Sequence, residues 1–107
     1  MICEWREYEV APGKMPAVHE HFEKYIVPLF KKHGLKVVGF WTTVVGTSNM
    51  LYYILSFDNL AHRENAWKSL RTDPDYQKES ARFSKEGVVV QRVRNTILEP
   101  TPYSPLK

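Results

Sequence analysis

The stretch Lys36–Phe57, KVVGFWTTVVGTSNMLYYILSF, decides the fold of this 107-residue chain. Two runs dense in β-branched and aromatic residues, Lys36–Val45 and Met50–Phe57, flank the turn-forming residues Gly46–Asn49. This pattern predicts two strands joined as a hairpin. Apolar residues occupy positions of either parity in both runs, which indicates that both faces of the sheet are covered.

A strand and a helix are predicted before the hairpin. Ile2–Val10 is rich in β-forming residues and stops at Pro12-Gly13, which is typical of a strand followed by a turn. Between Met15 and Gly34 the apolar residues follow a three-and-four spacing that predicts an amphipathic helix. Pro28 removes a backbone hydrogen bond inside that helix, so we expect a kink or a break there.

Two helical segments and a last strand are predicted after the hairpin. Asp58 or Asn59 can cap a helix that runs to about Arg71. The sequence Thr72-Asp73-Pro74 then combines a capping residue with a proline at the first helical position, which predicts a further helix reaching Gly87. Val88–Leu98 supplies the last strand.

The element order predicts a single α+β domain over residues 1–107. A β-α-β-β-α-β order of this length is typical of a ferredoxin-like sandwich, a four-stranded antiparallel sheet with the helices on one face. The tail, residues 99–107, is too rich in proline to pair inside the sheet. Because the uncovered face is also apolar, we expect two copies to pack face to face as a homodimer.

The composition argues against several classes of partner. The net charge is +3, but acidic residues are interleaved with the basic ones, so no basic block predicts nucleic-acid binding. No apolar run approaches the roughly 18 residues of a membrane span, and no signal-peptide pattern is present. The single cysteine, Cys3, excludes a disulfide within the chain and a cysteine-based zinc site. We therefore expect a cytoplasmic protein without membrane or nucleic-acid partners.

No motif of high specificity predicts a reaction, a metal or a cofactor. The glycines fit no phosphate-binding pattern. His19 and His21 are two residues apart, which points them in different directions on a helix, so they cannot bind one metal ion together. The expectation is that no metal and no cofactor is bound.

The candidate site consists of polar residues on otherwise apolar faces. Arg6 and Tyr8 share strand parity with Ile2 and Val10, and Arg63 lies on the apolar line of its helix. Two arginines pointing into the gap between sheet and helices would form a cationic pocket for an anionic or aromatic small molecule. Its expected lining, besides Arg6, Tyr8 and Arg63, is Trp41, Tyr53 and Trp67.

A structural role for the same residues is the alternative. An arginine on an apolar stripe often lays its stem along the core and pairs with a carboxylate, here Glu4 or Glu64. Tryptophan and tyrosine at such spacings are often core residues.

The order of short motifs along the whole chain resembles the NIPSNAP family. The motifs are Glu4-x-Arg6-x-Tyr8, Pro12-Gly13-Lys14-Met15, Gly34, Val38-Gly39-Phe40-Trp41, Gly46-x-x-Asn49, Tyr53-x-Leu55, Leu60-x-x-Arg63-x-x-x-Trp67, Asp73-Pro74 and the closing Pro100-Thr101-Pro102-Tyr103-Ser104-Pro105. The resemblance implies a dimeric α-β barrel, whose other members include cofactor-free monooxygenases and polyketide cyclases. NIPSNAP proteins themselves have no established reaction.

The sequence leaves three functions open. The first is a small-molecule site, binding or enzymatic, in the cleft between sheet and helices. The second is a cofactor-free monooxygenase or cyclase, which rests on analogy of fold alone. The third is a non-catalytic module that dimerises and presents surface to a protein partner.

Overall fold

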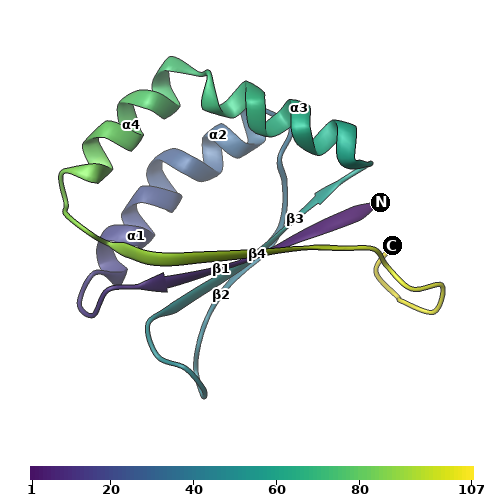
Figure 1. Ribbon diagram of the computed structural model, residues 1–107, viewed down its shortest axis with the longest axis horizontal. Helices are drawn as coiled ribbons and strands as arrows, with labels where there is room; N and C mark the ends of the chain where they lie inside the picture. The colour runs from purple at the N-terminus through teal and green to yellow at the C-terminus, as the bar shows by residue number, and fades with distance from the viewer.

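The computed structural model describes residues 1–107 as a four-stranded antiparallel sheet with all helices on one side (Figure 1). This confirms the predicted ferredoxin-like α+β architecture. The strands lie in the order β2-β3-β1-β4, so the two central strands are β3 and β1. The elements are β1 (Ile2–Val10), α1 (Met15–His21), η1 (Phe22–Ile26), α2 (Val27–Lys32), β2 (Lys36–Thr42), β3 (Met50–Phe57), α3 (Leu60–Arg71), α4 (Pro74–Ser84) and β4 (Val90–Leu98).

The first helix is interrupted by a π-helical turn, as the position of Pro28 predicts. Helix α1 passes into the π segment η1, and α2 begins at Val27 with Pro28 in its first turn. The N–H of Val27 donates to the carbonyl of Phe22, five residues earlier. Because Pro28 has no N–H and its ring crowds the preceding turn, the wider turn accommodates the proline without ending the helix.

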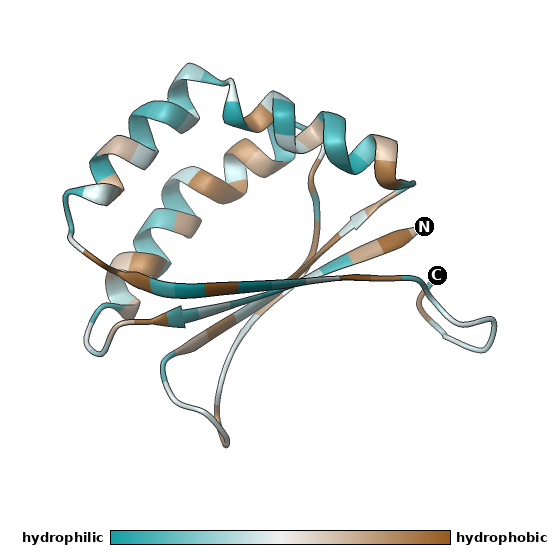
Figure 2. Cartoon of the chain, in the orientation of Figure 1, coloured by the Kyte–Doolittle hydropathy of each residue, from teal (hydrophilic) through white to brown (hydrophobic).

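The capping residues expected before α3 and α4 are confirmed. The side chain of Asn59 accepts a hydrogen bond from the N–H of His62 at 2.8 Å. Asp73 does the same for Asp75 at 2.7 Å, and Pro74 occupies the first turn of α4. Helix α4 is mostly hydrophilic (Figure 2), and it packs on α3 and η1.

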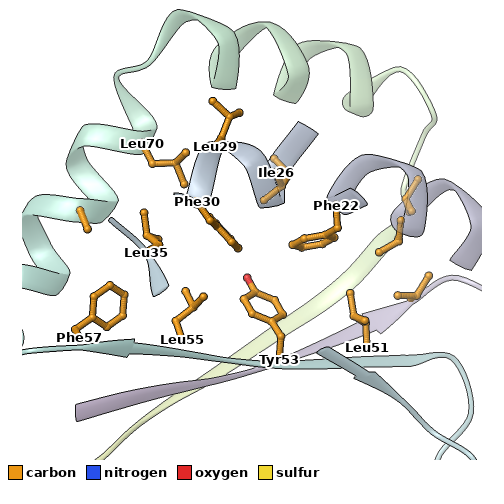
Figure 3. Close-up of a cluster of buried hydrophobic side chains, with 14 residues drawn as sticks. Phe22, Ile26, Leu29, Phe30, Leu35, Leu51, Tyr53, Leu55, Phe57 and Leu70 are labelled. Atoms are coloured by element: carbon orange, nitrogen blue, oxygen red, sulfur yellow. The ribbon is translucent and has the colours of Figure 1, made fainter. Parts of the chain in front are cut away.

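The core lies between the sheet and the helix formed by α1, η1 and α2 (Figure 3). Tyr53 of β3 stands at its centre, fully buried, with its hydroxyl pointing up between Phe22 and Phe30. Leu70 reaches the same core from α3. Tyr53 is thus a polar group inside an apolar layer, and its hydroxyl needs hydrogen-bond partners there.

Two strand boundaries differ from the expectation. Strand β2 ends at Thr42, three residues early, and Val44 and Val45 are almost fully exposed in the loop before β3. Strand β4 begins at Val90, where the pairing with β1 shifts register beside Glu9 and Val10. None of the helices is both long enough and apolar enough to cross a membrane.

The face of the sheet opposite the helices, here called the open face, carries no helix. Strand register places Trp5 and Glu7 of β1 on it, together with Tyr52 and Ile54 of β3. The rings of Trp5 and Tyr52 lie 5.7 Å apart. The open face therefore combines aromatic and charged side chains.

Candidate functional site

The candidate site is built around Glu4, a carboxylate buried between the sheet and α3. Strand alternation points Glu4, Arg6 and Tyr8 toward the helices, because their partners across β3 include the core residues Leu55 and Tyr53. The side chain of Glu4 is fully buried. A buried carboxylate is tolerated only when hydrogen bonds and opposite charge compensate its lost hydration.

Glu4 receives hydrogen bonds from four side chains. Arg63 of α3 binds it in a bidentate manner, through Nε to Oε1 at 2.9 Å and through Nη2 to Oε2 at 3.1 Å. Arg6 donates from Nη1 to Oε2 at 2.9 Å. Trp67 Nε1 and Asn95 Nδ2 complete the set at 2.9 Å and 3.1 Å. These five bonds saturate the carboxylate.

Arg6 links this carboxylate to two tyrosines. Its Nε donates to the hydroxyl of Tyr53 at 2.8 Å, and its Nη2 to the hydroxyl of Tyr8 at a longer 3.4 Å. The two hydroxyls lie 3.1 Å apart. The guanidinium also stands 4.9 Å from the centre of the Trp67 ring, a cation–π distance.

The electrostatics hold these groups in fixed protonation states. Burial raises the pKa of Glu4, but the hydrogen bonds from Arg63, Trp67 and Asn95 and the charge of Arg6 outweigh it, so the pKa falls to about 2. Burial raises the pKa of Tyr53 well above its usual value, which keeps the phenol neutral. Glu4 is therefore an anionic organiser of the site and not a general base at neutral pH.

A cavity of about 250 Å³ opens beside these arginines, and we call it the arginine cleft. It lies where β1 faces α3 and the start of α4. Its lining residues are Arg6, Arg63, Glu64, Trp67, Arg71 and Tyr76.

The arginine cleft offers more donors than the protein uses. A guanidinium carries five N–H groups. Arg6 uses one on each of its three nitrogens, which leaves two, and Arg63 uses two, which leaves three. Arg71 adds a third guanidinium, whose side chain takes part in none of the ion pairs.

Five of the six residues predicted for the site come together, but only Arg6, Arg63 and Trp67 of them line the arginine cleft. Arg6, Tyr8, Tyr53 and Arg63 join one hydrogen-bonded network through Glu4, and Trp67 donates to the same carboxylate. The alternative prediction, that an arginine pairs with Glu4, is also confirmed, for both arginines.

Trp41 is the exception, because it neither joins this network nor lines the arginine cleft. It pairs with Tyr52 and not with Tyr53, so it faces the open side of the sheet. Its ring lies over Gly39, where a Cβ atom would come within 2.8 Å of it. A register shift between Val37 and Gly39 causes this difference, because one unpaired residue reverses the face of those that follow.

Sequence reasoning missed three residues of the site. Asn95 donates to Glu4 across the sheet, and Arg71 and Tyr76 line the arginine cleft. The register of β4 against β1 decides which residue of the last strand meets Glu4, and no local sequence pattern predicts that register. The four-residue steps from Arg63 to Trp67 and from Trp67 to Arg71 could have suggested Arg71, because such residues share a helix face.

The motifs that meet at this site are those of a known family. A model of the NIPSNAP family matches residues 3–105. The chain belongs to the NIPSNAP family. Protein NipSnap homolog 3A of Homo sapiens is 35% identical to it over 80 residues, which cover 74% of this chain and 32% of that protein. The match thus spans about a third of the relative's length.

Solved structures of NIPSNAP proteins share the fold. A NIPSNAP family protein from Agrobacterium tumefaciens superposes with a TM-score of 0.90 at 24% identity, covering 99% of this chain and 98% of that chain. An antibiotic biosynthesis monooxygenase superposes with a TM-score of 0.64 at 10% identity, covering 95% of this chain and all of the other. At such identity the likeness concerns the fold alone.

Proposed function

We propose that this NIPSNAP domain binds a small organic anion in the arginine cleft. The observation that carries the proposal is the surplus of guanidinium N–H donors around a carboxylate that is already saturated. A planar carboxylate or a phosphate is the acceptor that such a donor array fits best.

The charges that line the cleft favour an anion. Three guanidinium groups, those of Arg6, Arg63 and Arg71, face two carboxylates, the buried Glu4 and the exposed Glu64. The cleft therefore keeps one net positive charge before a ligand binds. Because Glu4 and Trp67 hold Arg6 and Arg63 in place, little side-chain order is lost on binding.

The size and walls of the cleft restrict the ligand further. A volume of about 250 Å³ lies just below the usual range of small-molecule sites, so the ligand must be small. The rings of Trp67 and Tyr76 form its apolar walls. An anion carrying a single ring, such as benzoate, combines the required charge, size and flat shape.

We also propose that the domain is a homodimer joined through the open face. The rings of Trp5 and Tyr52 meet there at a tilt of 39°, and Trp41, 48% exposed, extends the aromatic surface to the edge strand. Glu7 pairs with Arg94 across the strands, so a two-fold arrangement can set acidic and basic groups of two copies against each other. Burying an aromatic patch of this kind is the usual driving force for association.

Titration of benzoate tests the anion proposal, with benzamide as its neutral counterpart. We expect benzoate to bind about tenfold more tightly, and Arg71→Gln to weaken benzoate three- to tenfold without affecting stability. Lys68→Gln, on the same helix but outside the cleft, is the matched control and should change little. Equal affinity for benzoate and benzamide, or equal effects of the two substitutions, would refute the proposal.

A further inference from the structure

A second cavity, larger than the arginine cleft, lies between η1 and the edge strand β2. Its volume is about 440 Å³, which is within the range of small-molecule sites. We call it the aromatic pocket, and it shares no lining residue with the arginine cleft. Its lining residues are His19, Phe22, Glu23, Val27, Phe40, Trp41, Thr42 and Leu51.

The π-helical turn shapes one wall of the aromatic pocket. Phe22 and Val27 are five residues apart, and the hydrogen bond between them closes the π turn, so both lie on the same side of the helix. In a regular α-helix, residues five apart would diverge and only one of them could face β2. The irregular turn therefore supplies two apolar side chains to one cavity.

Three aromatic rings, those of Phe22, Phe40 and Trp41, line the pocket. Phe22 and Phe40 meet edge to face, with their ring centres 5.4 Å apart. Although its strand position is on the open face, Trp41 lies on the edge strand, and it also borders this pocket and is 48% exposed. The negative faces of such rings attract a cation as well as an apolar body.

The side chains of His19, Glu23 and Thr42 supply the polar part of the lining. Glu23 is the only fully charged residue of the lining, and both it and His19 are exposed. Glu23 takes part in none of the ion pairs of the molecule. The acidic residues that do are Glu4, Asp58, Asp73 and Glu79.

We infer that the aromatic pocket binds a small organic cation, an amine attached to a ring or a short apolar chain. The apolar body would lie against Phe22, Phe40 and Val27, and the ammonium group at the rim beside Glu23. The charge preference is opposite to that of the arginine cleft, so the two sites select different molecules. The inference is independent of the proposed anion site, since no lining residue is common to both.

Amide NMR spectra of the whole chain with benzylamine test this inference, and benzyl alcohol is the uncharged probe. We expect benzylamine to shift the signals of Phe22, Phe40 and Thr42 and to bind three- to tenfold more tightly than benzyl alcohol. Glu23→Gln should abolish the difference between the two probes. Glu20→Gln, an exposed carboxylate of the same helix outside the pocket, should preserve it.

Three results would overturn the inference. The first is equal binding of benzylamine and benzyl alcohol by the unmodified chain. The second is equal loss of benzylamine binding in Glu20→Gln and Glu23→Gln, which would indicate attraction to the surface as a whole. The third is the absence of shifts at Phe40 and Thr42 at millimolar benzylamine. Both glutamates are exposed, so the two variants keep the fold and their spectra remain comparable.

Discussion

At the scale of single residues, Glu4 organises the site. Its buried carboxylate accepts hydrogen bonds from Arg6, two residues further along β1, from Arg63 of α3 and from Asn95 of β4. The same contacts that keep it ionised also hold both arginines in the lining of the cleft. One buried charge thus serves both the packing of α3 on the sheet and the geometry of the proposed anion site.

Replacement of this carboxylate tests its structural role. We expect Glu4→Gln to lower the free energy of unfolding by about 3 kcal/mol, because two partly buried guanidinium groups lose their counter-charge. Glu86→Gln, an exposed carboxylate near the start of β4, should change it by less than about 0.5 kcal/mol. Urea denaturation at pH 7 measures both.

The lowered pKa of Glu4 predicts that its contribution to stability depends on pH. The pKa of Glu4 is lowered to about 2 from an ordinary value of 4.5, so its stabilisation is complete above about pH 4.5 and is lost as the pH falls toward 2. The stability difference between the unmodified chain and Glu4→Gln should therefore shrink across that window. A difference that stays constant from pH 7 to pH 2.5 would contradict the account.

Part of this site follows from local sequence and part does not. The alternation of Ile2–Val10 is sufficient to place Arg6 and Tyr8 on one face, and helical spacing aligns Arg63 with Trp67. The five hydrogen bonds that Glu4 accepts depend on how strands and helices far apart in the chain are brought together. Such long-range register is a property of the packed molecule and not of any local pattern.

At the scale of elements, the first helix shows how the fold accommodates a proline inside a helix. Pro28 predicts an interruption, but the sequence does not say of which kind. In the structure the interruption is a π turn, which keeps Phe22, Ile26 and Phe30 all directed into the core. A complete break would have removed one of these side chains from the layer shown in Figure 3.

The end of that helix provides a test of backbone conformation. Gly34 has a φ of 77°, and the N–H of Leu35 donates to the carbonyl of Phe30 at 2.9 Å, which is a Schellman ending. A Cβ atom at residue 34 would meet nothing closer than 3.8 Å. Gly34→Ala should therefore cost about 1 kcal/mol through backbone strain alone.

Gly34→Asn separates backbone strain from steric crowding. Asparagine is larger than alanine but adopts the left-handed conformation more readily. We therefore expect Gly34→Asn to unfold at a higher temperature than Gly34→Ala. The reverse order would mean that space and not conformation limits this position.

The edge strand shows where prediction from the sequence fails at this scale. The hairpin Lys36–Phe57 is recognisable from composition, and β3 has the expected limits. The register shift after Val37 is not recognisable, and it moves Trp41 to the open face. Phe40 and Trp41 are consecutive and both aromatic, so the sequence does not show which of them faces the core.

At the scale of the whole molecule, the open face predicts the oligomeric state. A dimer through this face should have twice the 12.5 kDa mass of the chain in light scattering. Trp5→Arg places a charge among the aromatic residues and should shift the mass toward the monomer. Leu60→Arg is the control, since Leu60 is 59% exposed on α3, away from the open face. A monomeric mass of the unmodified protein would refute the dimer.

The arginine cleft gives the most direct test of the central claim. A crystal structure of the protein soaked with 4-bromobenzoate locates the anion by the anomalous signal of bromine. The account predicts a carboxylate within about 3.2 Å of guanidinium nitrogens of Arg6 or Arg63, with the ring beside Trp67. Bromine found only at other sites, with the cleft free of anion at saturating ligand, would contradict it.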